Sequence, residues 1–185
     1  MIAMKIKSTK RNKKKFLKLF AYLVIIFSLS WFFESQATTT YLFIRHADLG
    51  ITTGGNNPPL SMNGYQQSLT LADRLKDIDV VAGLNQIYTD QSQRSIETAT
   101  PLAQALNINI RTENLSEVEP FISKTLRAHK GEIIMIVGDA EVIPPLVEEL
   151  HGSKNLPRND ELNFNQLYIV TVPWFGKVKT LRINL

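Results

Sequence analysis

The sequence predicts an α/β fold: a three-layer α/β/α sandwich with a mostly parallel sheet. One observation is that short segments rich in β-branched and aromatic residues alternate with segments of helical periodicity. Another is that Pro173-Trp174-Phe175-Gly176 is a short connection containing glycine between the last two strand candidates. That connection predicts a hairpin, which adds an antiparallel edge to the sheet.

The strands are predicted where β-branched and aromatic residues lie between turn signals. They are Tyr41–Ile44, Gln86–Thr89, Ile108–Arg111, Glu132–Val137, Gln166–Val172 and Val178–Ile183. Four helices are predicted between them. One begins after the N-cap candidate Ser61, one covers 92–106 and is broken or kinked near Pro101, and the others cover 120–129 and 142–150.

Charge separates a leader, residues 1–37, from a single domain of residues 38–185. The leader holds eight of the 21 Lys and Arg residues and one of the 17 acidic residues. The remaining 13 basic and 16 acidic residues give residues 38–185 a formal charge of −3. The basic character of the chain therefore belongs to the leader, and no nucleic-acid partner is expected for the domain.

The leader has the pattern of a secretion signal. An uncharged, mostly apolar stretch from Leu19 to Phe33 precedes Ser35-Gln36-Ala37, whose small first and third residues suit a signal peptidase. A cleaved signal peptide predicts a periplasmic or otherwise extracytoplasmic domain. The alternative is an uncleaved anchor that extends back across Lys18 towards the roughly 20 residues a spanning helix needs. The domain would then lie outside an inner membrane that it contacts only through the leader.

The residues after the first strand carry the clearest chemical signal. Arg45 and His46 follow Tyr41–Ile44 and precede a loop rich in glycine, asparagine and proline. Ligands of open α/β sheets bind at the carboxyl ends of strands, so a histidine held there beside a cation is a candidate nucleophile towards an anion such as phosphate. Arg94 also follows a strand end. The chain has no cysteine, which excludes disulfides, thiolate metal sites and a cysteine nucleophile.

Four stretches together resemble the histidine phosphatase superfamily, which has the phosphoglycerate-mutase-like fold, and in particular its small bacterial members. They are 41–48, a strand followed by Arg-His-Ala-Asp; 59–67, which contains Leu-Ser-x-x-Gly-x-x-Gln; 87–99, a strand, a turn, an arginine and Thr-Ala; and 136–144, which contains Gly138-Asp139. Each motif alone is common, whereas their order, spacing and strand-end placement are specific. The resemblance covers nearly all of residues 40–185.

The resemblance implies hydrolysis of phosphomonoesters without a metal or cofactor. His46 would attack phosphorus to form a phosphohistidine, Arg45 and Arg94 would hold the phosphoryl oxygens, and water would then release phosphate. The residue types suit these roles, because neutral imidazole is a good nucleophile and a guanidinium matches phosphoryl oxygens bidentately. The expected partner is a phosphorylated small molecule or a phosphoprotein.

The chain departs from the family at Asp139, where the resemblance calls for a second histidine. Two like charges about 4 Å apart repel by roughly 4 kcal/mol at an effective dielectric constant of about 20. An ionised Asp139 would therefore oppose phosphate binding by about three orders of magnitude, unless it is protonated, pairs with Arg45 or Arg94, or meets a cationic part of the ligand. His129 and His151 are both expected at the surface, away from the strand ends, and so replace nothing.

Three hypotheses follow from this departure. The first is a weakened or specialised phosphatase with Asp139 in its catalytic site, whose rate would rise towards acid if that carboxyl is protonated. The second is an inactive relative that binds a phosphorylated ligand or partner without turnover. The third is an adaptor with a vestigial pocket, which the retained Arg45, His46 and Arg94 disfavour.

Five further residues are candidates for the site. Asn57 and Ser61 are expected to contact substrate, although an Asn-Pro turn and a helix N-cap explain them equally well. Glu117 and Glu119 are candidates for the proton donor by their position after Arg94, as the resemblance implies, and Glu141 is a third because it lies just past Asp139.

Overall fold

The computed structural model describes residues 2–34, 38–50, 57–77, 83–156 and 164–185. The chain forms two compact units, residues 1–37 and residues 38–185. In the first unit, helix α1 (Ile2–Glu34) includes a 20-residue stretch, Lys13–Phe32, that is long and apolar enough to cross a membrane. None of this stretch is buried. The helix is thus consistent with a signal sequence or an anchor.

The second unit is built on a six-stranded sheet with the order β3-β2-β4-β1-β5-β6. The strands are β1 (Thr39–Arg45), β2 (Leu84–Thr89), β3 (Ile110–Thr112), β4 (Ile133–Gly138), β5 (Gln166–Val172) and β6 (Lys179–Asn184). Strands β1 to β4 pair in parallel, whereas β5 pairs antiparallel with both β1 and β6. The predicted mostly parallel sheet with an antiparallel edge is confirmed.

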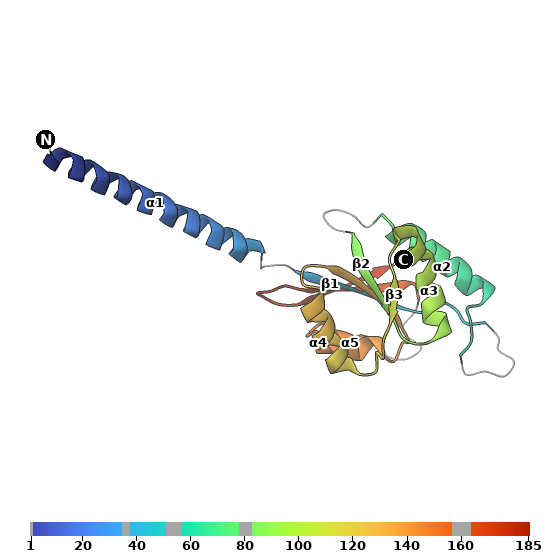
Figure 1. The fold of residues 1–185 in the computed structure, drawn as a ribbon. Helices are drawn as coiled ribbons and strands as arrows, with labels where there is room; N and C mark the ends of the chain where they lie inside the picture. The colour runs from blue at the N-terminus through green and yellow to red at the C-terminus, as the bar shows by residue number, and fades with distance from the viewer. Residues whose placement is uncertain (1, 35–37, 51–56, 78–82, 157–163) are drawn as a thin grey trace. The chain divides into compact units, whose positions relative to one another are not determined.

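Helices cover both faces of this sheet (Figure 1). They are α2 (Met62–Leu75), α3 (Gln93–Leu106), α4 (Val118–Ala128) and α5 (Ile143–Glu149). Successive strand residues point to opposite faces, so Phe43 of β1 joins a core cluster with α4 and α5 while Leu42 joins one with α2 and α3. The three-layer α/β/α sandwich predicted from the sequence is therefore confirmed.

Two helices begin at side-chain caps close to the strand ends. Ser61 caps α2 by accepting a hydrogen bond from the Gly64 N–H at 2.9 Å, as predicted. Ser92 caps α3 in the same way, with Ser95 as the donor. The expected break near Pro101 is absent, because α3 continues as one helix from Gln93 to Leu106.

The topology brings several loops to one edge of the sheet. Parallel strands β1, β4 and β2 are neighbours, so their carboxyl ends lie at the same edge. Helices α2 and α3 start at that edge after the loops that follow β1 and β2. The opposite edge holds Thr39, where β1 begins.

Candidate active site

Histidine 46 and aspartate 139 follow two adjacent strands and therefore meet. His46 follows β1 and Asp139 follows β4, and the last residues of those strands, Arg45 and Gly138, are paired in the sheet. The His46 N–H also donates to the Gly138 carbonyl at 3.1 Å, which extends the pairing by one residue. Only 5% of the His46 side chain is exposed. Its position is thus fixed by the sheet.

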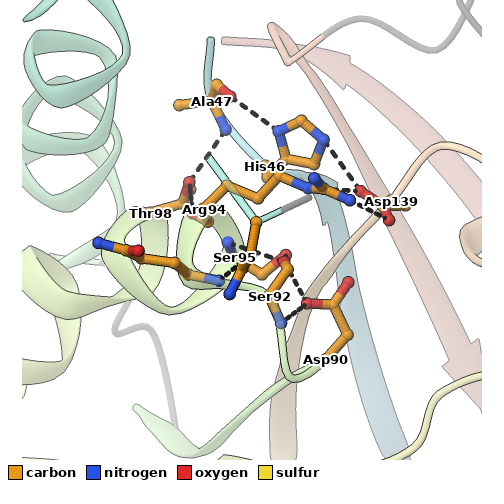
Figure 2. A network of polar contacts seen from close by, with 10 residues as sticks. His46, Ala47, Asp90, Ser92, Arg94, Ser95, Thr98 and Asp139 are labelled. Atoms are coloured by element: carbon orange, nitrogen blue, oxygen red, sulfur yellow. Dashed lines mark hydrogen bonds and ion pairs between the residues drawn. The ribbon is translucent and has the colours of Figure 1, made fainter. Parts of the chain in front are cut away.

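Arginine 94 reaches the same point from the first turn of α3 (Figure 2). The turn is fixed by its cap, because Ser92 accepts from the Ser95 N–H and its own N–H donates to Asp90 at 2.9 Å. The guanidinium of Arg94 contacts both carboxylate oxygens of Asp139, with Nε–Oδ1 at 3.0 Å and Nη2–Oδ2 at 2.7 Å. This is a bidentate pair, the strongest geometry available to an arginine and a carboxylate.

The imidazole of His46 is held by a hydrogen bond at each ring nitrogen (Figure 2). Nδ1 lies 2.8 Å from the Ala47 carbonyl oxygen, and because a carbonyl only accepts, Nδ1 carries a proton. Nε2 lies 3.0 Å from Asp139 Oδ1. Asp139 therefore contacts the ring nitrogen that is not bound to the backbone.

The Asp139 carboxylate is stabilised in its ionised form. The hydrogen bond from His46, followed by that from Arg94, holds the pKa of this carboxyl well below its usual range despite partial desolvation. The same contact raises the pKa of Arg94. A depressed pKa in the folded state stabilises the fold above the unfolded-state pKa, and that stabilisation is lost as the pH falls through the folded-state value. Near neutral pH, Asp139 is therefore a charged partner of Arg94 that also contacts His46.

The loop after His46 is tied to both helices on its side of the sheet. The Ala47 N–H donates to Thr98 Oγ1 of α3 at 2.9 Å. The Asp48 carboxylate accepts from the amides of Asn63 and Gln67 of α2 at 2.6 and 2.9 Å. Asp48 thus connects the loop to α2.

The two expected substrate contacts serve as helix caps. Asn57 Oδ1 accepts from the Gln93 N–H at 2.8 Å, and Ser61 Oγ accepts from the Gly64 N–H. Both side-chain oxygens thus stabilise the starts of α3 and α2, the helices that flank the His46 loop. Arg45 ends β1 and is partly buried beside this loop.

The three candidate proton donors lie in exposed positions. Glu117 precedes α4 and accepts from the Asn114 amide at 2.9 Å. Glu119 is exposed in the first turn of α4, and Glu141 is exposed two residues after Asp139. None of the three lines the described cavity that Asp139 borders.

That cavity has a volume of about 340 Å³ and an acidic lining. It is lined by Asp90, Gln91, Ser92, Glu113, Asn114, Leu115, Ser116, Asp139 and Val142. Glu113 pairs with Lys124 at 2.6 Å and was missed by the sequence reasoning. The signal was available, because Glu113 directly follows the third strand and strand ends were already the expected location of the site. Among the described residues, no group of three or more acidic or histidine side chains is placed to hold a metal ion.

The expectation of a surface position for His129 is wrong. Its side chain is buried, with Nε2 2.8 Å from the Tyr88 hydroxyl and Nδ1 2.6 Å from Glu132 Oε2. Its carbonyl accepts from Thr39 at the start of β1, so His129 does lie away from the His46 edge, as expected. His151 is exposed. Neither histidine takes the place that Asp139 occupies.

Comparisons with known proteins agree with the fold and the family. Residues 41–119 match the histidine phosphatase superfamily (branch 1), a segment that includes His46 and Arg94. No curated protein matched the sequence. The family match thus covers the segment that carries the candidate nucleophile.

Solved structures share the architecture at low sequence identity. The protein histidine phosphatase SixA complexed with tungstate has a TM-score of 0.64 at 16% identity, over 78% of this chain and 96% of that one. A mycobacterial glucosyl-3-phosphoglycerate phosphatase has a TM-score of 0.59 at 12% identity, over 80% of this chain and 98% of that one. Mycobacterial hydrolase 1 has a TM-score of 0.61 at 12% identity, over 80% of this chain and 99% of that one. At these identities the likeness establishes the fold alone.

Proposed function

We propose that residues 38–185 form a phosphomonoester hydrolase that acts through His46 and whose turnover Asp139 keeps low. The family match supports the reaction class, since members of this superfamily are typically phosphoric monoester hydrolases. The observation that carries the proposal is the convergence of His46 and Arg94 at the carboxyl edge of the sheet. No packing requirement places a buried imidazole and a guanidinium together at strand ends.

In the proposed reaction, His46 Nε2 forms a bond to phosphorus as the bond between phosphorus and the ester oxygen breaks. The leaving oxygen takes up a proton, and water then attacks phosphorus to release phosphate and free His46. Arg45 and Arg94 would hold the phosphoryl oxygens, because guanidinium groups donate in the matching geometry. The ring orientation suits this role, since the Nδ1–H bond to Ala47 directs Nε2 away from the backbone.

Asp139 opposes this reaction in two ways. Its oxygens occupy the hydrogen-bonding groups of Arg94 that a phosphoryl group would use. Its Oδ1 also lies 3.0 Å from His46 Nε2, the atom that must attack phosphorus. Both contacts must be broken before an anionic ester can bind productively. Asp90 also lines the adjoining cavity, whereas Glu113 on the same lining is paired with Lys124.

A second candidate function is binding without turnover. It is favoured by the Asp139 contacts with His46 and Arg94, which occupy the proposed nucleophile and its neighbouring guanidinium in the resting site. The two candidates differ in one observable: a slow hydrolase releases phosphate by a route that requires His46, whereas a binding protein does not. In either case the proposed partner is a phosphorylated small molecule or phosphoprotein.

The test is phosphate release from p-nitrophenyl phosphate, with His46→Ala as the blank, from about pH 4 to about pH 8. We expect the wild-type domain to be slow but faster than the blank. The expected rise towards acid is not retained, because the depressed pKa of Asp139 keeps it charged over this range. The wild-type rate should therefore show no rise towards acid from protonation of Asp139. Equal rates for the wild type and the blank would contradict the hydrolase and favour binding without turnover.

We propose that residues 1–37 are a targeting leader and that the domain is extracytoplasmic. The support is the exposed apolar stretch Lys13–Phe32 of α1 together with the lysine-rich sequence before it. A cleaved signal peptide would release a periplasmic domain, and an uncleaved leader would anchor it. Fractionation of cells followed by sequencing of the mature N-terminus distinguishes the two.

A further inference from the structure

The turn between β5 and β6 exposes two large aromatic side chains. Trp174 is 58% exposed and Phe175 is 85% exposed. The residues on either side do pack inward, because Val172 and Val178 contact the core cluster beneath α4 and α5. Neither aromatic residue belongs to a core cluster of the described residues. Proline and glycine suffice for the turn itself, so forming the turn does not require the exposed ring of Phe175.

This turn lies at the edge of the sheet opposite His46. Val172, the last residue of β5, pairs with Thr39, the first residue of β1. His46 follows the other end of β1, a strand of seven residues. At about 3.3 Å per residue, the strand separates the two edges by roughly 20 Å. The aromatic residues are therefore at the edge where the polypeptide leaves the leader and begins the domain.

Positive charge adjoins the two aromatic residues. Lys177 and Lys179 follow them at the start of β6, and both side chains are exposed. Tryptophan side chains favour the boundary between lipid and water, and lysines near a bilayer are attracted to anionic headgroups. The apolar stretch of α1 ends at Phe32, only seven residues before Thr39.

We propose that this aromatic tip, residues 173–179, binds the surface of a lipid bilayer that contains anionic headgroups. Trp174 and Phe175 enter the interfacial region, and Lys177 and Lys179 contact the headgroups. The interaction directs the His46 edge away from the bilayer towards the aqueous compartment. It adds a contact of the domain itself to the one made by an uncleaved leader, and it does not depend on phosphatase activity.

Trp174 is the reporter for the first experiment. The chain has two tryptophans, so a Trp31→Phe full-length protein contains Trp174 alone. We expect its fluorescence to shift to shorter wavelength in vesicles containing phosphatidylglycerol and to be quenched by brominated acyl chains. The neutral comparison is the same protein in phosphatidylcholine vesicles, where the quenching should be weaker. An unquenched Trp174 with a water-exposed spectrum in both vesicles overturns the proposal.

The second experiment measures binding of residues 38–185 to the same vesicles by sedimentation. Both core clusters consist only of residues from this part of the chain, so it retains its entire core. We expect Phe175→Ser to weaken binding at least about tenfold, because a ring leaves the apolar phase. The matched control is Met62→Ser, which removes a side chain 79% exposed near the other edge of the sheet. It should change binding less than about twofold.

Charge is tested by Lys177→Glu, with Arg111→Glu of β3 as the control on the far strand of the sheet. We expect Lys177→Glu to weaken binding to anionic vesicles at least about fivefold and to leave binding to neutral vesicles unchanged. The control variant should bind both kinds of vesicle nearly as the wild type does. Equal losses in the two variants would show attraction by net charge alone and contradict the proposal. A domain that avoids vesicles and sediments as a dimer through this tip would instead identify a second copy as its partner.

Discussion

Asp139→His is expected to raise kcat/KM for p-nitrophenyl phosphate by about two to three orders of magnitude. The substitution removes a carboxylate whose repulsion of a phosphoryl anion about 4 Å away is roughly 4 kcal/mol at an effective dielectric constant of about 20. It also releases the Arg94 guanidinium and the His46 imidazole from their present partner. The measurement is steady-state phosphate release by the purified variant at neutral pH.

Two further variants separate the contributions to this gain. Asp139→Asn removes the charge at nearly constant shape and should recover part of it. The His46→Ala/Asp139→His double variant should return to the blank, because the proposed nucleophile is gone. The gain should be accompanied by lower stability, since two charge-assisted contacts are lost. A folded Asp139→His protein no faster than wild type would contradict the inhibitory role.

Gly64→Ala is expected to destabilise the domain by about 1–3 kcal/mol or more, which lowers Tm by roughly 3–10 °C at this size. A Cβ atom at this position would lie 2.1 Å from the Asp48 carbonyl oxygen. That oxygen belongs to backbone and already accepts from the Ser61 N–H at 2.9 Å, so it is not free to move. Thermal unfolding followed by circular dichroism measures the effect.

Gly83→Ala is the matched control, because a Cβ atom there meets nothing within 4 Å. Its Tm should stay close to that of wild type. The clash at Gly64 acts on the loop two residues after His46, so Gly64→Ala should also lower any activity that Asp139→His restores. Unchanged stability of Gly64→Ala would show that α2 does not fix this loop.

Much of the fold is predictable because local signals agree with the tertiary structure. The apolar run before Gly138 and the one before Arg45 become the central strands β4 and β1, buried by helices on both faces. Ser61 is a correct N-cap because its side chain acts within the next three residues. The prediction of a break at Pro101 is wrong, because α3 runs without interruption from Gln93 to Leu106, whereas the alternative of a kink there stays a prediction.

The site is predictable only to the level of strand ends. His46 and Asp139 are predicted as site residues because each follows a strand. The sequence leaves open whether Asp139 is protonated or paired. The answer depends on Arg94 arriving from a helix and on the ring orientation set by the Ala47 carbonyl. These are contacts between distant segments that no local pattern specifies.

The surface position predicted for His129 is wrong because of a contact that the sequence does not reveal. Its chain neighbours Ala128 and Lys130 are exposed, which is what the polar sequence around it suggests. The ring nevertheless turns inward, because the Tyr88 hydroxyl offers a buried partner and Glu132 accepts at the other nitrogen. A buried histidine whose two nitrogens are both satisfied is stable, and the sequence does not reveal the tyrosine that makes this so.

The central claim is that the protein's own carboxylate occupies the place of an anionic ligand. Calorimetric titration of inorganic phosphate into wild-type and Asp139→Asn proteins tests it most directly, because binding requires no turnover. We predict that the variant binds phosphate about two to three orders of magnitude more tightly than wild type, in line with the removed charge repulsion. Equal affinities, or tighter binding by wild type, would contradict the claim.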